Sequence, residues 1–189
     1  MRRLQARGID TGFVNAYHPH FFTHRPRWIS VTAVMCETAG GPLRTLEDLH
    51  EERALYMDYT NQLLWERGCA VPLCSLRKAA KICSKLARNY SFCLYEYFLT
   101  DPVEHRGTLA GATRMLDNLD KFLFVRVEQA LLQSFLYLVR SDQGNIEAMS
   151  HNGHTGNQVP TLIWGDMQAL VAGESSVLIA RSALWSKTF

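Results

Sequence analysis

The residues best suited to chemistry are imidazoles and thiols, and they gather in two stretches of the chain. Three histidines lie between residues 18 and 24, upstream of Cys36, and His151 and His154 lie in a later polar stretch. Imidazole nitrogen and thiolate sulfur are ligands that zinc and other transition metals prefer. Neither stretch has a recognised zinc spacing, such as paired Cys-x2-Cys units or His-Glu-x-x-His. We therefore expect no metal and no cofactor.

Nucleophiles and phosphate-binding loops also lack a recognisable motif. The chain contains no Gly-x-Ser-x-Gly elbow, no phosphate loop and no dinucleotide fingerprint. The segment Gly173-Glu174-Ser175-Ser176 lacks the second glycine of the elbow. Asp117 and Asp120 fall on a predicted exposed helix face beside basic residues, which is typical of solubilising carboxylates. We therefore predict no catalytic residue, and we do not expect an enzyme.

Five basic side chains recur along one predicted helix and could follow the phosphates of a nucleic acid. The net charge of the chain is only +2, whereas proteins that coat nucleic acid are usually far more basic. The same face carries no interleaved aromatic residues of the kind that stack on single strands. A solvated or acid-paired helix face is the preferred interpretation, and nucleic-acid binding is the alternative. The residues of this basic stripe are Arg77, Lys78, Lys81, Lys85 and Arg88.

Residues 1–41 are predicted to form an extended basic and aromatic N-terminal arm. Pro19 and Pro26 prevent a continuous helix, and residues 29–35 alternate in polarity like a short strand. Aromatic residues with arginine and few acids are typical of interface cores, so we expect the arm to bind another protein. The alternative is that the arm folds back on the rest of the chain. The predicted partner-binding residues are Tyr17, His18, Phe21, Phe22, Arg25, Arg27 and Trp28.

The remaining elements are predicted to be helices that together make one helical domain, residues 42–189. Helix starts are indicated by the Thr45 and Asp48 capping pair, by Ser75 and by Thr108. The predicted longer helices span 45–67, 75–99 and 108–140, and the predicted short ones span 161–171 and 175–186, with a strand over 176–180 as the alternative to the last. The predicted fold class is all-α: an irregular bundle of three longer helices plus one or two short C-terminal helices, preceded by the extended arm.

The second half of the helix predicted over 108–140 is apolar on most sides, which indicates burial in protein or contact with lipid. A membrane span needs about 20 mostly uncharged residues, and Arg126 and Glu128 interrupt this stretch. We therefore predict no transmembrane span, while contact with a membrane surface stays open.

The cellular location is predicted from the cysteines and from the first residues. Five cysteines are an odd number, which argues against a fully paired secreted framework, although the redox state of Cys83 and Cys93 stays open. The segment Met1-Arg2-Arg3-Leu4-Gln5-Ala6-Arg7 is rich in arginine and free of acids, like an organellar targeting segment. We therefore expect a mitochondrial protein that is not secreted.

The function predicted from these patterns is that of a non-catalytic accessory or scaffold subunit. It would bind other subunits of a large assembly, such as a respiratory or ATP-synthase complex, through the arm and the apolar helix. Two alternatives belong to other classes: a nucleic-acid-binding protein, for example of a mitochondrial ribosome, that uses the basic stripe, and a helical interaction module, for example of viral origin.

Overall fold

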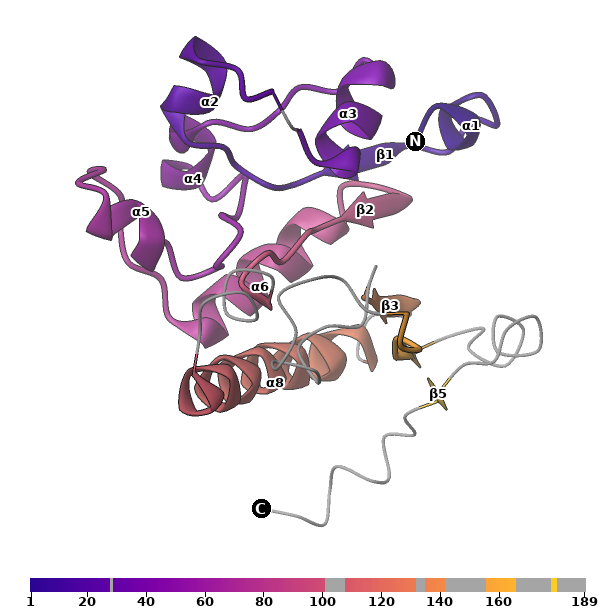
Figure 1. Ribbon diagram of the computed structural model, residues 1–189. Helices are drawn as coiled ribbons and strands as arrows, with labels where there is room; N and C mark the ends of the chain where they lie inside the picture. Colours follow the sequence, from indigo (N-terminus) through magenta and orange to yellow (C-terminus); the bar gives the residue numbers. More distant parts are fainter. Residues whose placement is uncertain (28, 101–107, 132–134, 142–155, 166–177, 180–189) are drawn as a thin grey trace. The chain divides into compact units, whose positions relative to one another are not determined.

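The computed structural model describes residues 1–27, 29–100, 108–131, 135–141, 156–165 and 178–179 (Figure 1). The chain divides into two compact units, Met1–Leu99 and Thr100–Phe189, which we call unit 1 and unit 2. Helices and strands occur in both, and the strands form one two-stranded and one three-stranded sheet. The predicted all-α bundle is therefore wrong. The division falls at residues 99–100, whereas the sequence interpretation placed a boundary at residues 41–42.

Unit 1 combines short helices with a parallel strand pair. Strand β1 pairs with β2 in a register that joins Thr11 to Phe92 and Phe13 to Leu94. At Gly12 a side-chain Cβ would lie 2.4 Å from the Tyr90 ring, so the close approach here requires glycine. The elements are α1 (Arg2–Gln5), β1 (Thr11–Phe13), α2 (Pro19–Thr23), α3 (Val31–Thr38), α4 (Leu46–His50), α5 (Gln62–Glu66), α6 (Leu76–Ala87) and β2 (Phe92–Leu94).

The prediction of an extended arm is wrong, because this segment crosses the interior of unit 1. After β1, the backbone N–H groups of Val14, Ala16 and Tyr17 donate to carbonyls of Leu94, Leu55 and Arg44 at 3.0, 2.7 and 2.9 Å. These partners lie far away in the sequence, so local patterns could not reveal them. The segment is held by the protein's own backbone. The residues predicted to be a strand, 29–35, instead begin α3, whose N-terminus is capped by the Ser30 hydroxyl.

The helix predicted over 45–67 is broken into α4 and α5. Its start is confirmed, because the Asp48 carboxylate accepts the Thr45 N–H at 2.9 Å. The helix ends at His50 because the backbone then takes left-handed conformations at Glu52, Tyr59 and Asn61. The core of unit 1 forms around this irregular connection and contains Ala16, Leu49, Ala54, Tyr56, Leu64 and Val71.

The helix predicted over 75–99 also begins as expected and ends early. The Ser75 hydroxyl accepts the Lys78 N–H at 3.2 Å and caps α6. The helix ends at Ala87, and the chain turns into β2, whose partner β1 lies near the N-terminus. A local helix pattern could not predict this long-range strand pair.

Unit 2 contains one long helix and a small sheet. The N-terminus of α8 (Leu109–Leu131) is capped by Thr108, whose hydroxyl accepts the Gly111 N–H at 3.1 Å, as predicted. Strand β3 (Tyr137–Arg140) pairs antiparallel with β4 (Thr161–Trp164), and β4 pairs parallel with β5 (Leu178–Ile179). Within the described part of the chain, no helix is long and apolar enough to cross a membrane.

The predicted helix over 108–140 is therefore right in its first part and wrong in its last. Residues 137–140 alternate between half-buried and exposed positions, as expected for a strand with one covered face. The helix predicted over 161–171 begins instead as β4, and residues 166–171 lie outside the described residues. For 175–186, only Leu178 and Ile179 are described, and they form the strand β5 that was the alternative.

Candidate functional site

The predicted partner-binding residues occupy different environments in unit 1. Tyr17, His18 and Phe21 are half-buried and line a cavity of about 140 Å³. Phe22 is 47 % exposed, and Arg25 forms a two-pronged ion pair with Glu37. Arg27 is exposed, and Trp28 lies outside the described residues. Three of the seven residues therefore line one cavity, and two more lie beside Phe21: the Phe22 ring centroid is 5.7 Å from that of Phe21, and the Arg25 guanidinium is 5.7 Å from the Phe21 ring centroid. Binding of other subunits through this segment stays untested.

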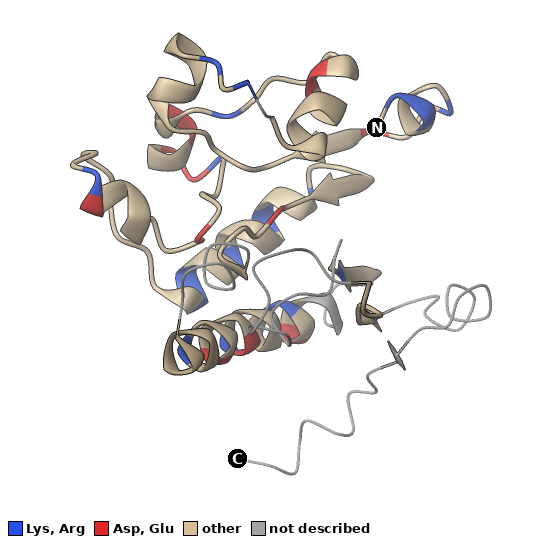
Figure 2. Ribbon diagram, in the orientation of Figure 1, with Lys and Arg blue, Asp and Glu red and all other residues tan. Residues whose placement is uncertain are grey.

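The basic stripe is an exposed face of α6, where Figure 2 shows several Lys and Arg positions along the helix. All five of its residues are exposed. The Lys78 ammonium lies 2.8 Å from the Glu52 carboxylate, and this partner raises the pKa of Lys78 and lowers that of Glu52. Lys78 is therefore acid-paired, as the preferred interpretation of this face expected.

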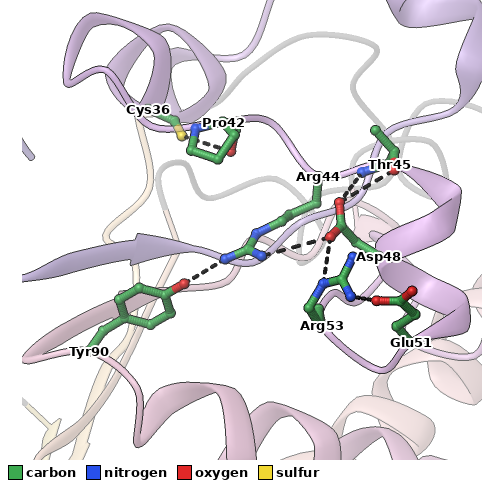
Figure 3. A network of polar contacts seen from close by, with 8 residues as sticks. All are labelled: Cys36, Pro42, Arg44, Thr45, Asp48, Glu51, Arg53 and Tyr90. Atoms are coloured by element: carbon green, nitrogen blue, oxygen red, sulfur yellow. Dashed lines mark hydrogen bonds and ion pairs between the residues drawn. The ribbon is translucent and has the colours of Figure 1, made fainter.

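A polar network centred on Asp48 joins α4 to the start of β2 (Figure 3). The Arg44 guanidinium donates to the Tyr90 hydroxyl at 2.5 Å and lies 3.9 Å from Asp48, which also accepts from Arg53 at 3.0 Å. Burial alone would raise the pKa of Asp48, but the hydrogen bonds of Thr45 and Arg53 and the two arginine charges outweigh burial and lower it. Arg53 also forms an ion pair with Glu51, so two arginines face two carboxylates and the network holds the fold without a free charge.

A second buried carboxylate organises the connection between α4 and α5. Asp58 is 2 % exposed, and its carboxylate accepts the N–H groups of Asn61 at 2.9 Å and Leu63 at 2.8 Å. Burial nevertheless raises the pKa of Asp58 above its ordinary value. These bonds satisfy donors at the start of α5, so Asp58 acts as a helix cap rather than as a general base.

Several tyrosine and cysteine side chains of unit 1 are shifted toward their neutral forms. Burial raises the pKa of Tyr59 to about 12 and also raises the pKa of Tyr97. The rings of these two tyrosines are stacked, with their centroids 5.2 Å apart. Burial also raises the pKa of Cys36 and Cys74. A catalytic cysteine needs a lowered pKa, because the thiolate is the nucleophile. These groups therefore stabilise unit 1 and are not activated for catalysis.

In unit 2, a buried arginine on α8 contacts an aromatic residue of the sheet. Arg126 is 5 % exposed, and its guanidinium lies 5.0 Å from the ring centroid of Tyr137 on β3. Tyr137 in turn stacks on Trp164 of β4 at 5.7 Å. A cation over an aromatic face is attracted by the ring quadrupole. This layer fixes α8 against the sheet of unit 2.

Sequence reasoning missed Arg44, Asp58 and Arg126 as organising residues. Asp58 begins an Asp-Tyr-Thr-Asn run that is typical of turns and helix caps, and this signal could have ended the helix predicted over 45–67. Arg126 was noted only as an interruption of an apolar stretch. An arginine on a buried face needs a partner, and the signal was therefore available.

The described residues include His, Cys, Asp and Glu side chains, the residue types that bind metals. Among them, no group of three or more His, Cys, Asp or Glu side chains is placed to hold a metal ion. The histidine-rich segment at residues 18–24 is described, and it forms no such group; the rings of His20 and His24 stack on one another at 4.5 Å. His151 and His154, the other metal-compatible pair in the sequence, lie outside the described residues.

Comparison with known proteins matches the chain to a protein family, to a curated protein and to a solved structure. The model of the Metalloenzyme superfamily matches residues 73–183, more than half of the chain. The 2,3-bisphosphoglycerate-independent phosphoglycerate mutase of Paracoccus denitrificans (strain Pd 1222) is 29% identical over 94 residues, which cover 46% of this chain and 18% of that protein. The solved structure of the PH0037 protein from Pyrococcus horikoshii superposes with a TM-score of 0.56 at 17% identity, over 87% of this chain and 40% of that one.

These matches overturn the predicted class of function. The chain spans about a fifth of the length of the curated relative and 40% of the matched structure. The family and the relative point to an enzyme-like fold, so the non-catalytic scaffold subunit of a mitochondrial complex and the prediction of no enzyme are both wrong. The nucleic-acid-binding and interaction-module alternatives fall with them. The predicted cellular location is not tested by these matches and stays a prediction.

The same findings correct the fold class, because an alternation of helices with a small mixed sheet replaces the helical bundle. The matched range includes α6, β2, α8 and the three strands of unit 2. This chain belongs to the Metalloenzyme superfamily, and its domain is of the α/β, phosphoglycerate mutase-like kind.

Proposed function

We propose that this chain takes part in metal-dependent phosphoryl transfer on small phosphorylated acids. The match of residues 73–183 to the Metalloenzyme superfamily carries the proposal. The similarity to a 2,3-bisphosphoglycerate-independent phosphoglycerate mutase supports the substrate class. In such chemistry the protein mainly positions the phosphoryl group and neutralises its developing charge.

The donor chemistry of the matched range supports a metal site in unit 2. All three histidines of the range, His105, His151 and His154, lie beyond residue 99, and carboxylates occur near them at Asp101 and Asp142. Imidazole and carboxylate are common ligands of catalytic divalent metals. These five residues lie outside the described residues, so we propose them from residue type and sequence position alone.

The described strands bring the ends of one of these segments together. Arg140, the last residue of β3, pairs with Thr161, the first residue of β4. The chain that carries Asp142, His151 and His154 therefore begins and ends at the same end of this strand pair. A bound divalent metal would supply positive charge to a phosphoryl oxygen. The β3–β4 pair and the Arg126–Tyr137–Trp164 layer would provide its rigid base.

The experiment is an activity assay of the full chain with and without metal. Purified protein is stripped with chelator, given Mg²⁺, Mn²⁺ or Zn²⁺, and mixed with a phosphoglycerate in the absence of 2,3-bisphosphoglycerate. We expect movement of the phosphoryl group, followed by ³¹P NMR, in at least one metal and none in the stripped protein. Equal rates in stripped and metal-loaded protein, or no reaction of any phosphoglycerate in every metal, would contradict the proposal.

A further inference from the structure

The cavity lined by Tyr17, His18 and Phe21 is formed wholly by residues of unit 1, none of which is among the proposed metal ligands. It has a volume of about 140 Å³, and Tyr56 and Phe98 also line it. A cavity of about 150 Å³ with apolar walls is large enough to hold benzene. The size of this cavity therefore suits a single six-membered ring.

Most polar groups around the cavity already have partners. The Asn15 side chain donates to the Glu96 carbonyl at 2.6 Å and accepts the Glu96 N–H at 2.8 Å. The Tyr17 hydroxyl bonds to Ser30, and burial raises the pKa of Tyr17 to about 12, so this group stays neutral. The Asn15 amide is therefore held by the Glu96 backbone, and the Tyr17 hydroxyl by Ser30.

His18 is a polar side chain of the cavity wall with one ring nitrogen that does not cap α2. Its Nδ1 accepts the His20 N–H at 3.0 Å and caps α2. A neutral imidazole whose Nδ1 accepts a hydrogen bond carries its proton on Nε2, which is then a donor. The cavity wall thus combines aromatic and thioether surface with one N–H donor.

We propose that this cavity binds a small aromatic carbonyl compound, such as an aromatic amide or carboxylate. The ring lies among Phe21, Tyr56, Met57 and Phe98, and the carbonyl oxygen accepts a hydrogen bond from His18 Nε2. Aromatic and sulfur contacts favour a ring at this position. A ring that carries a cationic amine has no acceptor for His18 and binds more weakly. Nothing in this inference depends on phosphoryl transfer.

The test uses Met57 as a reporter inside the cavity. Full-length protein with ¹³C-labelled methionine methyl groups gives one signal for each of its six methionines. Benzamide is titrated to about 10 mM, because a ligand of this size is expected to bind in the millimolar to micromolar range. We expect a saturable shift of the Met57 methyl signal, and an affinity for benzylammonium that is at least about 5-fold lower, as a lost hydrogen bond predicts.

Two matched pairs of variants make the test specific. His18→Asn keeps an acceptor that can cap α2 but removes the Nε2 donor, and we expect it to weaken benzamide binding about 5-fold. His24→Asn, at an exposed residue that does not line the cavity, should leave the affinity unchanged. Phe21→Leu should weaken binding more than Phe22→Leu, because only Phe21 lines the cavity.

Three results would overturn the inference: no shift of Met57 up to the highest benzamide concentration, equal binding of benzylammonium and benzamide, or His18→Asn and His24→Asn variants that bind alike. A thermal melt of each variant shows that it is folded. If His18→Asn does not fold, the Phe21→Leu and Phe22→Leu pair and the benzylammonium comparison decide the question with His18 intact.

Discussion

Units 1 and 2 differ in the kinds of contact that their described residues make and in where the histidines of the chain lie. In unit 1, hydrogen bonds join residues far apart in the sequence, as between Asn15 and Glu96, and buried tyrosines and thiols are shifted toward their neutral forms. In unit 2, the described residues form a long helix and a small sheet, and the three histidines of the family match lie beside these elements in the sequence. The comparison teaches that buried polar groups alone do not mark a catalytic centre.

The histidines of the two units also differ in their relation to the matched range. Unit 1 contains His18, His20, His24 and His50, and all of them precede the range that matches the Metalloenzyme superfamily. Within the described residues they form no metal-binding group. The histidines of the matched range belong to unit 2. The proposed function therefore places its metal ligands in unit 2 and gives unit 1 a supporting role.

The largest expected effects come from matched core truncations, one in each unit. Phe122 on α8 is 2 % exposed and Leu64 on α5 is 0 % exposed. We expect Phe122→Ala to lower the free energy of unfolding by about 3–5 kcal/mol and Leu64→Ala by about 2–5 kcal/mol, because each leaves a cavity. Hydrogen exchange followed by mass spectrometry should show the loss of protection first in unit 2 for Phe122→Ala and first in unit 1 for Leu64→Ala.

Leu73→Ala is the control for both variants. Leu73 is 55 % exposed, so its truncation should change the free energy of unfolding by no more than about 0.5 kcal/mol. Loss of protection spread evenly over residues 1–99 and over the described part of unit 2 in both core variants would break the division into two units.

A smaller effect on the free energy of unfolding, one that depends on pH, is expected for Asp48 in unit 1. The pKa of Asp48 is lowered in the folded protein, because its hydrogen bonds and arginine neighbours outweigh burial. Asp48 therefore contributes stability above its unfolded pKa of about 3.9, and this contribution is lost as the pH falls through the lower folded value. We expect Asp48→Asn to cost on the order of 1 kcal/mol at pH 7 and less at acid pH, measured by urea unfolding.

Asp117→Asn is the matched control in unit 2. Asp117 pairs with Lys121 at 2.6 Å, but both side chains are more than half exposed, and such pairs contribute little. An Asp48→Asn variant whose loss of stability is the same at pH 7 and at pH 3 would show that the charge of Asp48 has no role in the network of Figure 3.

Local signals in the sequence located the starts of three helices, α4, α6 and α8, but did not predict α1, α2, α3 or α5. Ser75 and Thr108 cap α6 and α8, and the Thr45–Asp48 bond opens α4, because a cap depends on residues a few positions apart. The predicted ends of these helices were wrong. In unit 1, the chain after Ala87 forms strand β2, which pairs with the distant strand β1. In unit 2, residues 137–140 pair with β4, although an apolar stretch of this kind also suits a buried helix.

The candidate site was less accessible to sequence reasoning than the fold. A search for short motifs looks for ligands at fixed spacing, whereas His105 and His154 are 49 positions apart in the sequence. His151 and His154 were considered as metal-compatible, but His105, which the proposed site adds to them, was not considered. Sites built from distant segments leave no local signature, which is why the family match was needed.

The proposed metal ligands are the histidines of the matched range and not those of the histidine-rich segment of unit 1. The most direct measurement is the metal content of the full chain after loading and desalting, by mass spectrometry of the metal. We predict bound metal in the natural protein, its loss in the triple variant His105→Asn, His151→Asn and His154→Asn, and its retention in the triple variant His18→Asn, His20→Asn and His24→Asn. Retention in the first variant, or loss in the second alone, would contradict the account.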